Sequence, residues 1–258
     1  MNLTNYIRER LQQKQILLMT HVVVGYPSLD DNWTMLEMMQ QSGVDLVELQ
    51  MPFTEPSADG PLFVKANQQA LKNGIRRDDY FEFMRKATAA FDFKILMMGY
   101  YNPVFVMGHH EFCRELHKNE SCGFILPDLP VEEFGDLFEY SRQYELSPIL
   151  VCAPTNTPER LRQVLAHGSG FLYCAARKGV TGTKTTLDQS QDGFISRCRE
   201  ISDLPLALGF GLSEAADIQQ LHGKVEIAIV GSALLHSWQE NGPQGYQHHL
   251  AGLAESCA

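Results

Sequence analysis

The sequence predicts a closed parallel (β/α)8 barrel, the TIM-barrel fold, with one extra helix at its N-terminus. Short apolar segments alternate with longer amphipathic segments along the 258 residues, and each kind occurs eight times. This alternation is typical of parallel strands that are each followed by a helix. A chain of about 250 residues fits one such barrel without a second domain. We therefore expect a single domain over residues 1–258.

The expected strands are rich in Val, Ile, Leu and Phe, as parallel strands buried on both faces usually are. They are Ile16–Val24, Leu46–Leu49, Lys94–Met98, Gly123–Leu126, Pro148–Cys152, Gly170–Cys174, Pro205–Leu208 and Ile227–Val230.

The expected helices carry apolar residues at helical spacing. They are Asp30–Gln41, Val64–Lys72, Asp78–Ala90, Glu111–Lys118, Glu132–Tyr144, Pro158–His167, Gln189–Ser202 and Ser213–Leu221, and a short amphipathic helix precedes the first strand. The competing architecture is an open doubly wound sheet, which normally carries Gly-x-Gly-x-x-Gly after its first strand. Residues 24–27 read Val-Gly-Tyr-Pro at that place, and this favours the barrel.

Composition argues against several classes of function. The formal net charge of −10 disfavours a nucleic-acid-binding surface, although a small anion needs only a local positive site. No segment approaches the roughly 20 apolar residues of a membrane-spanning helix, and the first residues lack the apolar core of a signal peptide. The six cysteines show no zinc-ligand spacing, so we expect reduced, buried thiols in a cytoplasmic protein without a bound metal.

Two acidic residues near the end of the second expected strand are candidates for acid–base catalysis. Glu48 lies inside the apolar segment, where burial disfavours a charged carboxylate and suits a group that donates a proton. Asp59 follows in a proline-containing loop, and the carboxyl ends of barrel strands face the active site. The alternative is structural, with a buried partner for Glu48 and a helix-capping role for Asp59.

Glycine-bearing turns follow the last three expected strands. Residues 177–182 read Arg-Lys-Gly-Val-Thr-Gly, residues 209–213 read Gly-Phe-Gly-Leu-Ser, and residues 231–233, Gly-Ser-Ala, open a helix. Glycines let backbone N–H groups approach an anion, and a helix N-terminus favours negative charge. Each turn alone is more often a plain turn. Their joint position predicts a phosphate site at the seventh and eighth loops, which is usual in such barrels.

These residues also carry a resemblance to a known family. Glu48-Leu49, Pro52-Phe53 and the run Ala-Asp-Gly-Pro at residues 58–61 resemble the signature of the tryptophan synthase α subunit. The similarity continues in the same order through residues 100–103, 127–133, 179–182, 209–211 and 231–232, and so covers nearly the whole chain. The motif around Glu48 and Asp59 is specific, whereas the glycine turns also fit other phosphate-binding barrels.

The resemblance implies a lyase of tryptophan biosynthesis that cleaves indole-3-glycerol phosphate to indole and glyceraldehyde 3-phosphate, a retro-aldol reaction without a cofactor. By resemblance, Glu48 protonates the indole C3 and helps to remove the glycerol hydroxyl proton, Asp59 takes the proton of the indole nitrogen, and Tyr173 lies beside the glutamate. Substrate contacts are implied at His21, Gln50, Tyr100, Thr181, Gly182, Phe210, Gly211, Gly231 and Ser232, with Thr181 in a loop that closes over the substrate. The implied partner is a pyridoxal-phosphate-dependent tryptophan synthase β subunit in an α2β2 complex.

Three residues depart from the family pattern. His21 replaces an aromatic residue of the first strand, Gln50 a glycine, and Glu55 an aspartate in a loop that contacts the β subunit. If His21 and Gln50 face the ring pocket without partners, they should weaken the binding of indole by roughly 1–3 kcal/mol. Hydrogen bonds between them, to Glu48 or to water would remove this penalty.

Two alternatives to the α-subunit function stay open. One is a diverged stand-alone lyase that acts on a modified indole-glycerol phosphate or releases free indole. The other is a weakly active allosteric partner of a β subunit, against which the retention of both Glu48 and Asp59 speaks.

Overall fold

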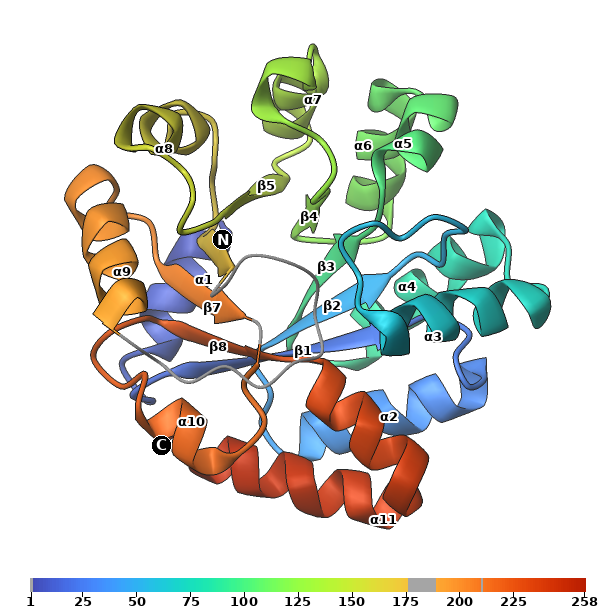
Figure 1. Cartoon of the computed structure of the whole chain (residues 1–258). Coiled ribbons are helices and arrows are strands. Elements are labelled where there is room, and N and C mark those ends of the chain that lie inside the picture. The colour runs from blue at the N-terminus through green and yellow to red at the C-terminus, as the bar shows by residue number, and fades with distance from the viewer. Residues whose placement is uncertain (1, 176–188, 210) are drawn as a thin grey trace.

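The computed structural model describes residues 2–175, 189–209 and 211–258. Eight strands follow one another around a closed barrel in sequence order, each parallel to the next, and β8 pairs with β1 (Figure 1). The strands are β1 (Leu17–Val23), β2 (Leu46–Gln50), β3 (Lys94–Met98), β4 (Gly123–Ile125), β5 (Ser147–Cys152), β6 (Leu172–Ala175), β7 (Leu206–Gly209) and β8 (Ile227–Val230). The expected barrel is confirmed, and every strand lies within two residues of its expected bounds.

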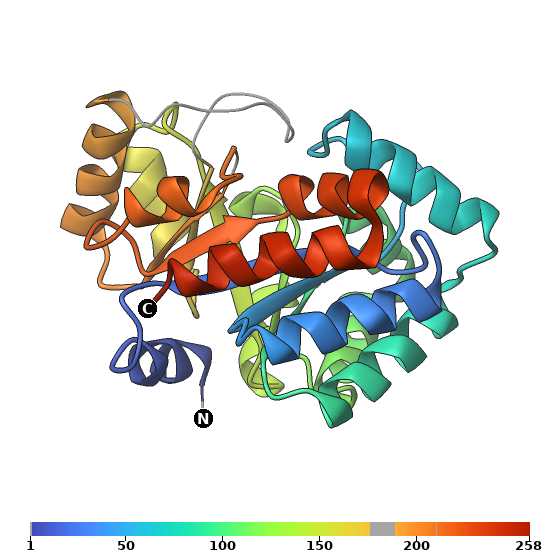
Figure 2. The same cartoon turned by 90° about the horizontal axis from the view of Figure 1, so that it is seen from below.

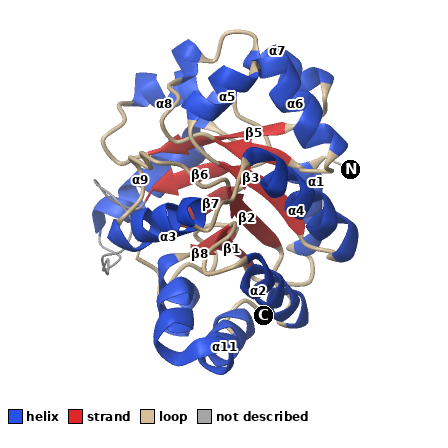
Figure 3. Cartoon of the chain, turned by 90° about the vertical axis from the view of Figure 1, so that its right-hand side faces the viewer, coloured by secondary structure: helices blue, strands red, loops and turns tan. Residues whose placement is uncertain are grey.

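Helices surround the strands, most of them in an outer layer (Figure 3). They are α1 (Leu3–Arg10), α2 (Leu29–Gln41), α3 (Pro61–Lys72), α4 (Arg77–Ala90), α5 (Tyr101–Met107), α6 (His109–Lys118), α7 (Leu137–Gln143), α8 (Pro158–Leu165), α9 (Gln189–Ile201), α10 (Ala215–Gln219) and α11 (Ser232–Glu255). The expected extra N-terminal helix is α1.

Two helical expectations differ from the structure. The single helix expected over Glu132–Tyr144 is wrong, because a short 3-10 turn (Val131–Glu133) ends before Gly135, whose φ of +51° interrupts a helix, and α7 begins only afterwards. Helix α5 was not expected, and its seven residues contain Pro103. Proline is tolerated there because it lies in the first turn, where the N–H has no partner within the helix.

Side chains along each strand point alternately into the barrel and out toward the helices, and this separates an inner core from an outer core. In β2, Val47 and Leu49 point outward and belong to the core between barrel and helices. Leu46 points inward, into the smaller core inside the barrel. Glu48 and Gln50 share the inward row with Leu46, so the same alternation that builds the core carries two polar side chains to the barrel mouth.

Helix α1 closes the amino-terminal end of the barrel. Leu3 and Ile7 pack into the inner core against the first residues of strands, such as Leu17 and Leu46. Figure 2 shows α1 below the barrel, apart from the ring of outer helices. With this end covered, access to the barrel interior is left at the carboxyl ends of the strands.

Candidate active site

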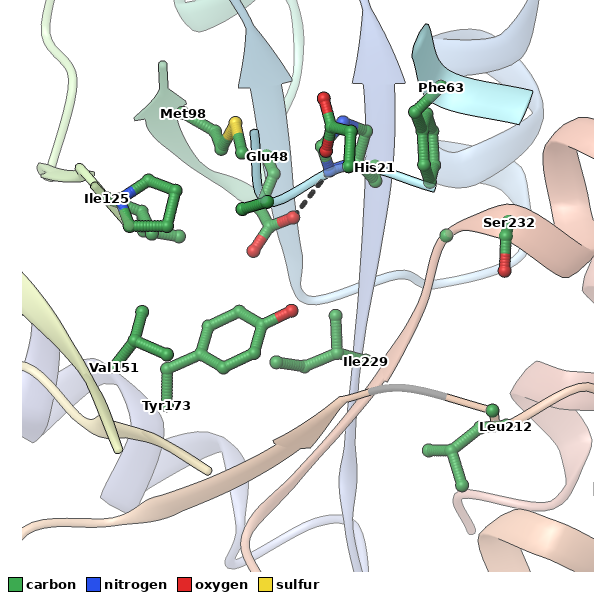
Figure 4. Close-up of a pocket in the computed structure, with 15 residues that line it drawn as sticks. His21, Glu48, Phe63, Met98, Ile125, Val151, Tyr173, Leu212, Ile229 and Ser232 are labelled. Atoms are coloured by element: carbon green, nitrogen blue, oxygen red, sulfur yellow. Dashed lines mark hydrogen bonds and ion pairs between the residues drawn. The ribbon is translucent and has the colours of Figure 1, made fainter. Parts of the chain in front are cut away.

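A cavity lies inside the barrel mouth, at the carboxyl ends of the strands (Figure 4). It encloses about 700 Å³ of empty space, part of which is open to solvent. The structure brings the following expected site residues together in its wall: His21, Glu48, Asp59, Tyr173, Gly211, Gly231 and Ser232. Apolar side chains supply much of the remaining wall, among them Phe63, Met98, Ile125, Val151, Leu212 and Ile229.

His21 and Glu48 face each other from neighbouring strands. They are register partners in the β1–β2 pair, so both side chains point into the barrel at the same level (Figure 4). The Nδ1 atom of His21 lies 2.6 Å from Oε2 of Glu48. Among the described residues, the other carboxylate oxygen, Oε1, is buried without a hydrogen-bond partner. Glu48 therefore has the buried partner that the structural alternative expected. It still keeps one oxygen for a ligand.

Asp59 is held by two side-chain amides. Nε2 of Gln50 donates to Oδ2 of Asp59 at 2.7 Å, and Nδ2 of Asn67 donates to the same oxygen at 3.2 Å. The helix-capping alternative is wrong, because the N-cap of α3 is Gly60 and this helix end has no side-chain cap hydrogen bond. Asp59 instead lies at the cavity wall, ahead of the helix.

Burial and hydrogen bonds shift the acid–base properties of the site. Burial raises the pKa of Asp59 above its ordinary value, and hydrogen bonds from Gln50 and Tyr100 offset only part of this. Burial lowers the pKa of His21, but the hydrogen bond to Glu48 and the charges of Glu48 and Asp59 outweigh it, so the net shift is upward. The site thus combines an aspartate and a histidine whose pKa values are both raised.

Tyr173 forms the wall opposite Glu48, with its hydroxyl pointing into the cavity (Figure 4). Burial raises the pKa of this phenol well above its ordinary range, so it stays neutral and can donate a hydrogen bond. Its place depends on the neighbouring strand, because a Cβ atom on Gly209 would lie only 2.7 Å from the tyrosine oxygen. Gly209 at the end of β7 therefore leaves room for the ring.

Gln50 and Tyr100 lie behind the cavity wall that the described residues define. Both side chains are buried, at 0% and 1% exposure. Gln50 bonds to His21 and Asp59, while the Tyr100 hydroxyl accepts from the N–H of Ala58, next to Asp59, at 3.2 Å. His21 and Gln50 are therefore not unpaired. The hydrogen bond between them removes the expected loss of indole binding.

The candidate anion site is formed by Gly211, Gly231 and Ser232 at one end of the cavity. Gly211 has a φ of +90°, a conformation that favours glycine. Gly231 is the N-cap of α11 and makes no side-chain cap hydrogen bond, so the N-cap does not compete with a ligand for the first N–H groups of this helix. The other expected contacts, Thr181, Gly182 and Phe210, lie outside the described residues.

Two further residues of the site were missed from the sequence. Phe63 lines the cavity with its ring centroid 4.6 Å from that of His21. Asn67 bonds to both Asp59 and Gln50. A signal for Asn67 existed, since it shares the buried face of α3 with Phe63, Ala66 and Ala70 at helical spacing, where an amide needs a partner.

Within residues 2–175, 189–209 and 211–258, no group of three or more His, Cys, Asp or Glu side chains is placed to hold a metal ion. In the same part of the chain, no helix is both long and apolar enough to cross a membrane.

Fold and site together define a TIM-barrel enzyme with candidate acid–base side chains and a candidate anion site around an apolar cavity. The family model described as "Tryptophan synthase alpha chain" matches residues 7–257. The chain therefore belongs to the tryptophan synthase alpha chain family.

Individual relatives agree with this assignment. The tryptophan synthase alpha chain of Desulfotalea psychrophila is 45% identical over 253 residues, which cover 98% of this chain and 100% of the relative. Mycobacterium tuberculosis tryptophan synthase has a similar structure, with a TM-score of 0.91, 29% identity and coverage of 99% of this chain and 97% of the other. The tryptophan synthase complex of Pyrococcus furiosus, at 24% identity, shares the fold with a TM-score of 0.84 over 93% of this chain and 98% of its own.

Proposed function

We propose that this chain cleaves indole-3-glycerol phosphate to indole and glyceraldehyde 3-phosphate, as the α subunit of a tryptophan synthase. The observation that carries the proposal is the free oxygen of Glu48. Its Oε1 atom is buried at the cavity wall without a partner among the described residues, while Oε2 is held by His21. Family membership favours this function over the diverged lyase and the weakly active partner considered above.

In the proposed reaction, Glu48 moves one proton between two positions of the substrate. Its carboxyl group protonates C3 of the indole and accepts the proton of the glycerol hydroxyl, which becomes the aldehyde oxygen of the product. The bond between C3 and the glycerol carbon breaks, and its electron pair returns to the ring. Asp59 accepts the proton of the indole nitrogen while C3 is protonated and then gives it back, a role that suits its raised pKa.

The remaining walls of the cavity match the two ends of this substrate. Met98, Ile125 and Val151 offer an apolar surface for the indole ring. Gly211, and Gly231 at the amino end of α11, offer backbone N–H groups for the phosphate. The reaction proposed here needs no cofactor in the α subunit.

The proposed partner is a pyridoxal-phosphate-dependent tryptophan synthase β subunit in an α2β2 complex. Support comes from membership of the family and from two exposed apolar side chains on α5, Phe105 and Val106, at 66% and 78% exposure. A cytoplasmic location is proposed from the cysteines, all six of which are free and five of which are buried.

The test is an assay of the purified chain on indole-3-glycerol phosphate, with and without a β subunit. We expect release of indole and glyceraldehyde 3-phosphate, and a loss of about 10²–10⁴-fold in kcat for Glu48→Gln and for Asp59→Asn, the usual contribution of a general acid or base. Circular dichroism should show both variants folded. Near-parental turnover in a folded variant would remove that residue from the mechanism, and absence of cleavage by the parent with a β subunit would refute the function.

A further inference from the structure

A chain of hydrogen bonds links the two carboxylates of the site. Glu48 Oε2 lies 2.6 Å from Nδ1 of His21, and the other ring nitrogen, Nε2, lies 2.7 Å from Oε1 of Gln50. Nε2 of Gln50 lies 2.7 Å from Oδ2 of Asp59. The two side chains that depart from the family pattern, His21 and Gln50, are therefore the bridge between the proposed acid and the proposed base.

The direction of this chain is set by Asn67. The amide oxygen of Asn67 accepts from the backbone N–H of Phe53 at 3.0 Å, and its nitrogen donates to the backbone carbonyl of Phe63 at 2.8 Å. A backbone N–H can only donate and a carbonyl can only accept, so these two bonds decide which end of the amide is oxygen. The Asn67 amide has one orientation.

That orientation in turn sets the orientation of Gln50. The amide nitrogen of Gln50 faces two acceptors, Oδ2 of Asp59 at 2.7 Å and Oδ1 of Asn67 at 3.4 Å. Turning the amide over would place its oxygen against these oxygens. The Gln50 oxygen therefore faces Nε2 of His21, and this nitrogen must carry a hydrogen.

One proton remains to be placed between His21 and Glu48. Nδ1 and Oε2 are 2.6 Å apart and would repel each other if both were bare. A proton between them, bound to either atom, makes this contact favourable. Because Nε2 already has its hydrogen, protonation of Nδ1 makes His21 an imidazolium beside the Glu48 carboxylate.

The surroundings of His21 favour this protonated pair. Its ionisable neighbours are Glu48 from β2 and Asp59 from the following loop, both acidic, and Tyr173 faces the site from β6 as a neutral phenol. α3 contributes the ring of Phe63, and the residue at the start of α11 that comes near the His21 side chain is Gly231. The charges nearest to His21 on these elements are therefore negative.

We propose that His21, oriented by Gln50, is a positioning residue for Glu48. His21 holds Oε2 of Glu48 through one proton, and Oε1 of Glu48 is left directed at the substrate. The transferred proton travels on Oε1, while the proton on Nδ1 stays in place and compensates the negative charge of Glu48 each time Oε1 is deprotonated. The kinetic consequence rests on the proposed function, whereas the placement of protons is a property of the free protein.

The proposed role of His21 predicts the direction in which activity changes with pH. The hydrogen bond and negative charge of Glu48 outweigh the effect of burial and raise the pKa of His21 above its ordinary value of about 6.5. His21 therefore keeps both ring protons to a higher pH than an ordinary histidine, and loses one as the pH rises through its raised pKa. Loss of the Nδ1 proton leaves two bare atoms facing each other, so kcat/KM should fall as the pH rises through the pKa of His21.

The first test observes the protons directly in the free protein. Nuclear magnetic resonance of protein labelled with 15N-histidine reports the protonation of both ring nitrogens, and the His21 signals are those lost in His21→Asn. We expect Nε2 to be protonated at all pH values and the titration midpoint to lie above about 6.5. Gln50→Leu should lower this midpoint, by about one pH unit, because Nε2 loses its acceptor. A bare Nε2 at neutral pH, or a midpoint that Gln50→Leu leaves unchanged, would overturn the proposal.

The second test compares this midpoint with kinetics on indole-3-glycerol phosphate. In the parent, the alkaline limb of kcat/KM should coincide with the His21 midpoint. His21→Asn keeps an N–H donor near Oε2 but does not titrate, so kcat/KM should fall by up to about tenfold below the limb, and the limb should disappear. A limb that persists unchanged in His21→Asn would contradict the proposal.

The chain offers a matched control in His248→Asn. His248 is exposed on α11, away from the cavity, and its substitution should leave both the limb and the His21 signals in place. If the parent cleaves no indole-3-glycerol phosphate, the proposed function fails, and the resonance titration still decides the arrangement of protons.

Discussion

The burial of Asp59 opposes folding and suits the role of base that is proposed for this residue. Burial raises the pKa of its carboxyl, although two amides donate to Oδ2. A carboxyl with a higher pKa in the folded than in the unfolded protein binds its proton more tightly when folded, so stability falls as the pH rises through the interval between the two values. At neutral pH the ionised side chain therefore lowers the free energy of unfolding, and in the same place it is a better base.

We therefore expect Asp59→Asn to raise the free energy of unfolding at neutral pH while it abolishes most of the cleavage. The amide keeps an oxygen acceptor for Gln50 and Asn67 and buries no charge. The gain should shrink as the pH approaches about 4, where the parental carboxyl is increasingly protonated as well. Urea denaturation at several pH values measures the difference.

The control for this experiment is Asp78→Asn, because the side chain of Asp78 is 88% exposed. It should change stability little at any pH. Loss of stability in Asp59→Asn at neutral pH would show that the hydrogen bonds of the carboxylate outweigh the cost of its burial.

At the scale of an element, α11 matters through its amino end. Its N-cap, Gly231, gives the helix no side-chain cap, and the first turn contains no acidic residue. Partial positive charge at this end is therefore not compensated by the helix itself. The same helix end lines the cavity, which suits the phosphate of the proposed substrate.

A carboxylate in this first turn should separate helix stability from substrate binding. Ser232→Asp adds a negative charge that favours the helix by about 0.3–1 kcal/mol, so the melting temperature should hold or rise. The same charge repels a phosphate, and we expect KM for indole-3-glycerol phosphate to rise about tenfold or more and inhibition by inorganic phosphate to weaken. Steady-state kinetics and thermal unfolding measure the two effects.

Ser232→Asn is the matched control, because it has nearly the same size as the aspartate variant and no charge. Its KM should stay within about threefold of the parental value. An unchanged KM in Ser232→Asp would place the phosphate elsewhere.

At the scale of the whole molecule, the two ends of the barrel have different tasks. The amino-terminal end carries a fully buried carboxylate, Asp45, which precedes β2. It accepts from Arg10 at 3.0 and 2.9 Å, from Lys14 at 2.8 Å and from the backbone N–H of Leu18 at 3.1 Å. These bonds tie α1 and the segment after it to the first two strands, at the end of the barrel opposite the cavity.

We expect Asp45→Asn to lower the free energy of unfolding by about 2–4 kcal/mol, because two cations lose the charge that compensates them. The side chain of Arg10 is 33% exposed, which keeps the loss below that of a fully buried pair. The site lies at the other end of the barrel, so kcat well below the melting temperature should stay near the parental value. Asp78→Asn is again the control and should cost less than about 0.5 kcal/mol. A large fall in kcat in folded Asp45→Asn would show that the two ends are coupled.

Much of the fold was predictable because its signals are local. Each strand is a short apolar segment, and each helix repeats its apolar residues at helical spacing, so their order and approximate bounds follow from neighbours in sequence. Helix breaks were less predictable. Gly135 adopts a positive φ that ends the turn before α7, whereas glycines elsewhere in the chain are compatible with helices, such as Gly252 inside α11.

The candidate acid–base pair could also be found from the sequence, because Glu48 is a charged residue in an apolar strand and Asp59 follows it in a motif typical of the family. Asn67 could not be assigned to the site in the same way, since a polar residue on a buried helix face has many potential partners. Its partners became known only when α3 packed beside the loop that contains Asp59.

The sequence by itself determined the barrel, its order of strands and the residue types at its mouth. These features follow from the spacing of apolar residues and from the composition of short segments of the chain. Only the tertiary structure decided that His21 and Gln50 are partners rather than unpaired polar groups in a ring pocket. That outcome depends on the register of β1 against β2, which sets His21 beside Glu48. It depends as well on backbone groups of Phe53 and Phe63 that orient Asn67 and, through it, Gln50. Which side-chain atom donates and which accepts is decided by contacts between segments that are distant in sequence, so a local sequence pattern cannot predict it.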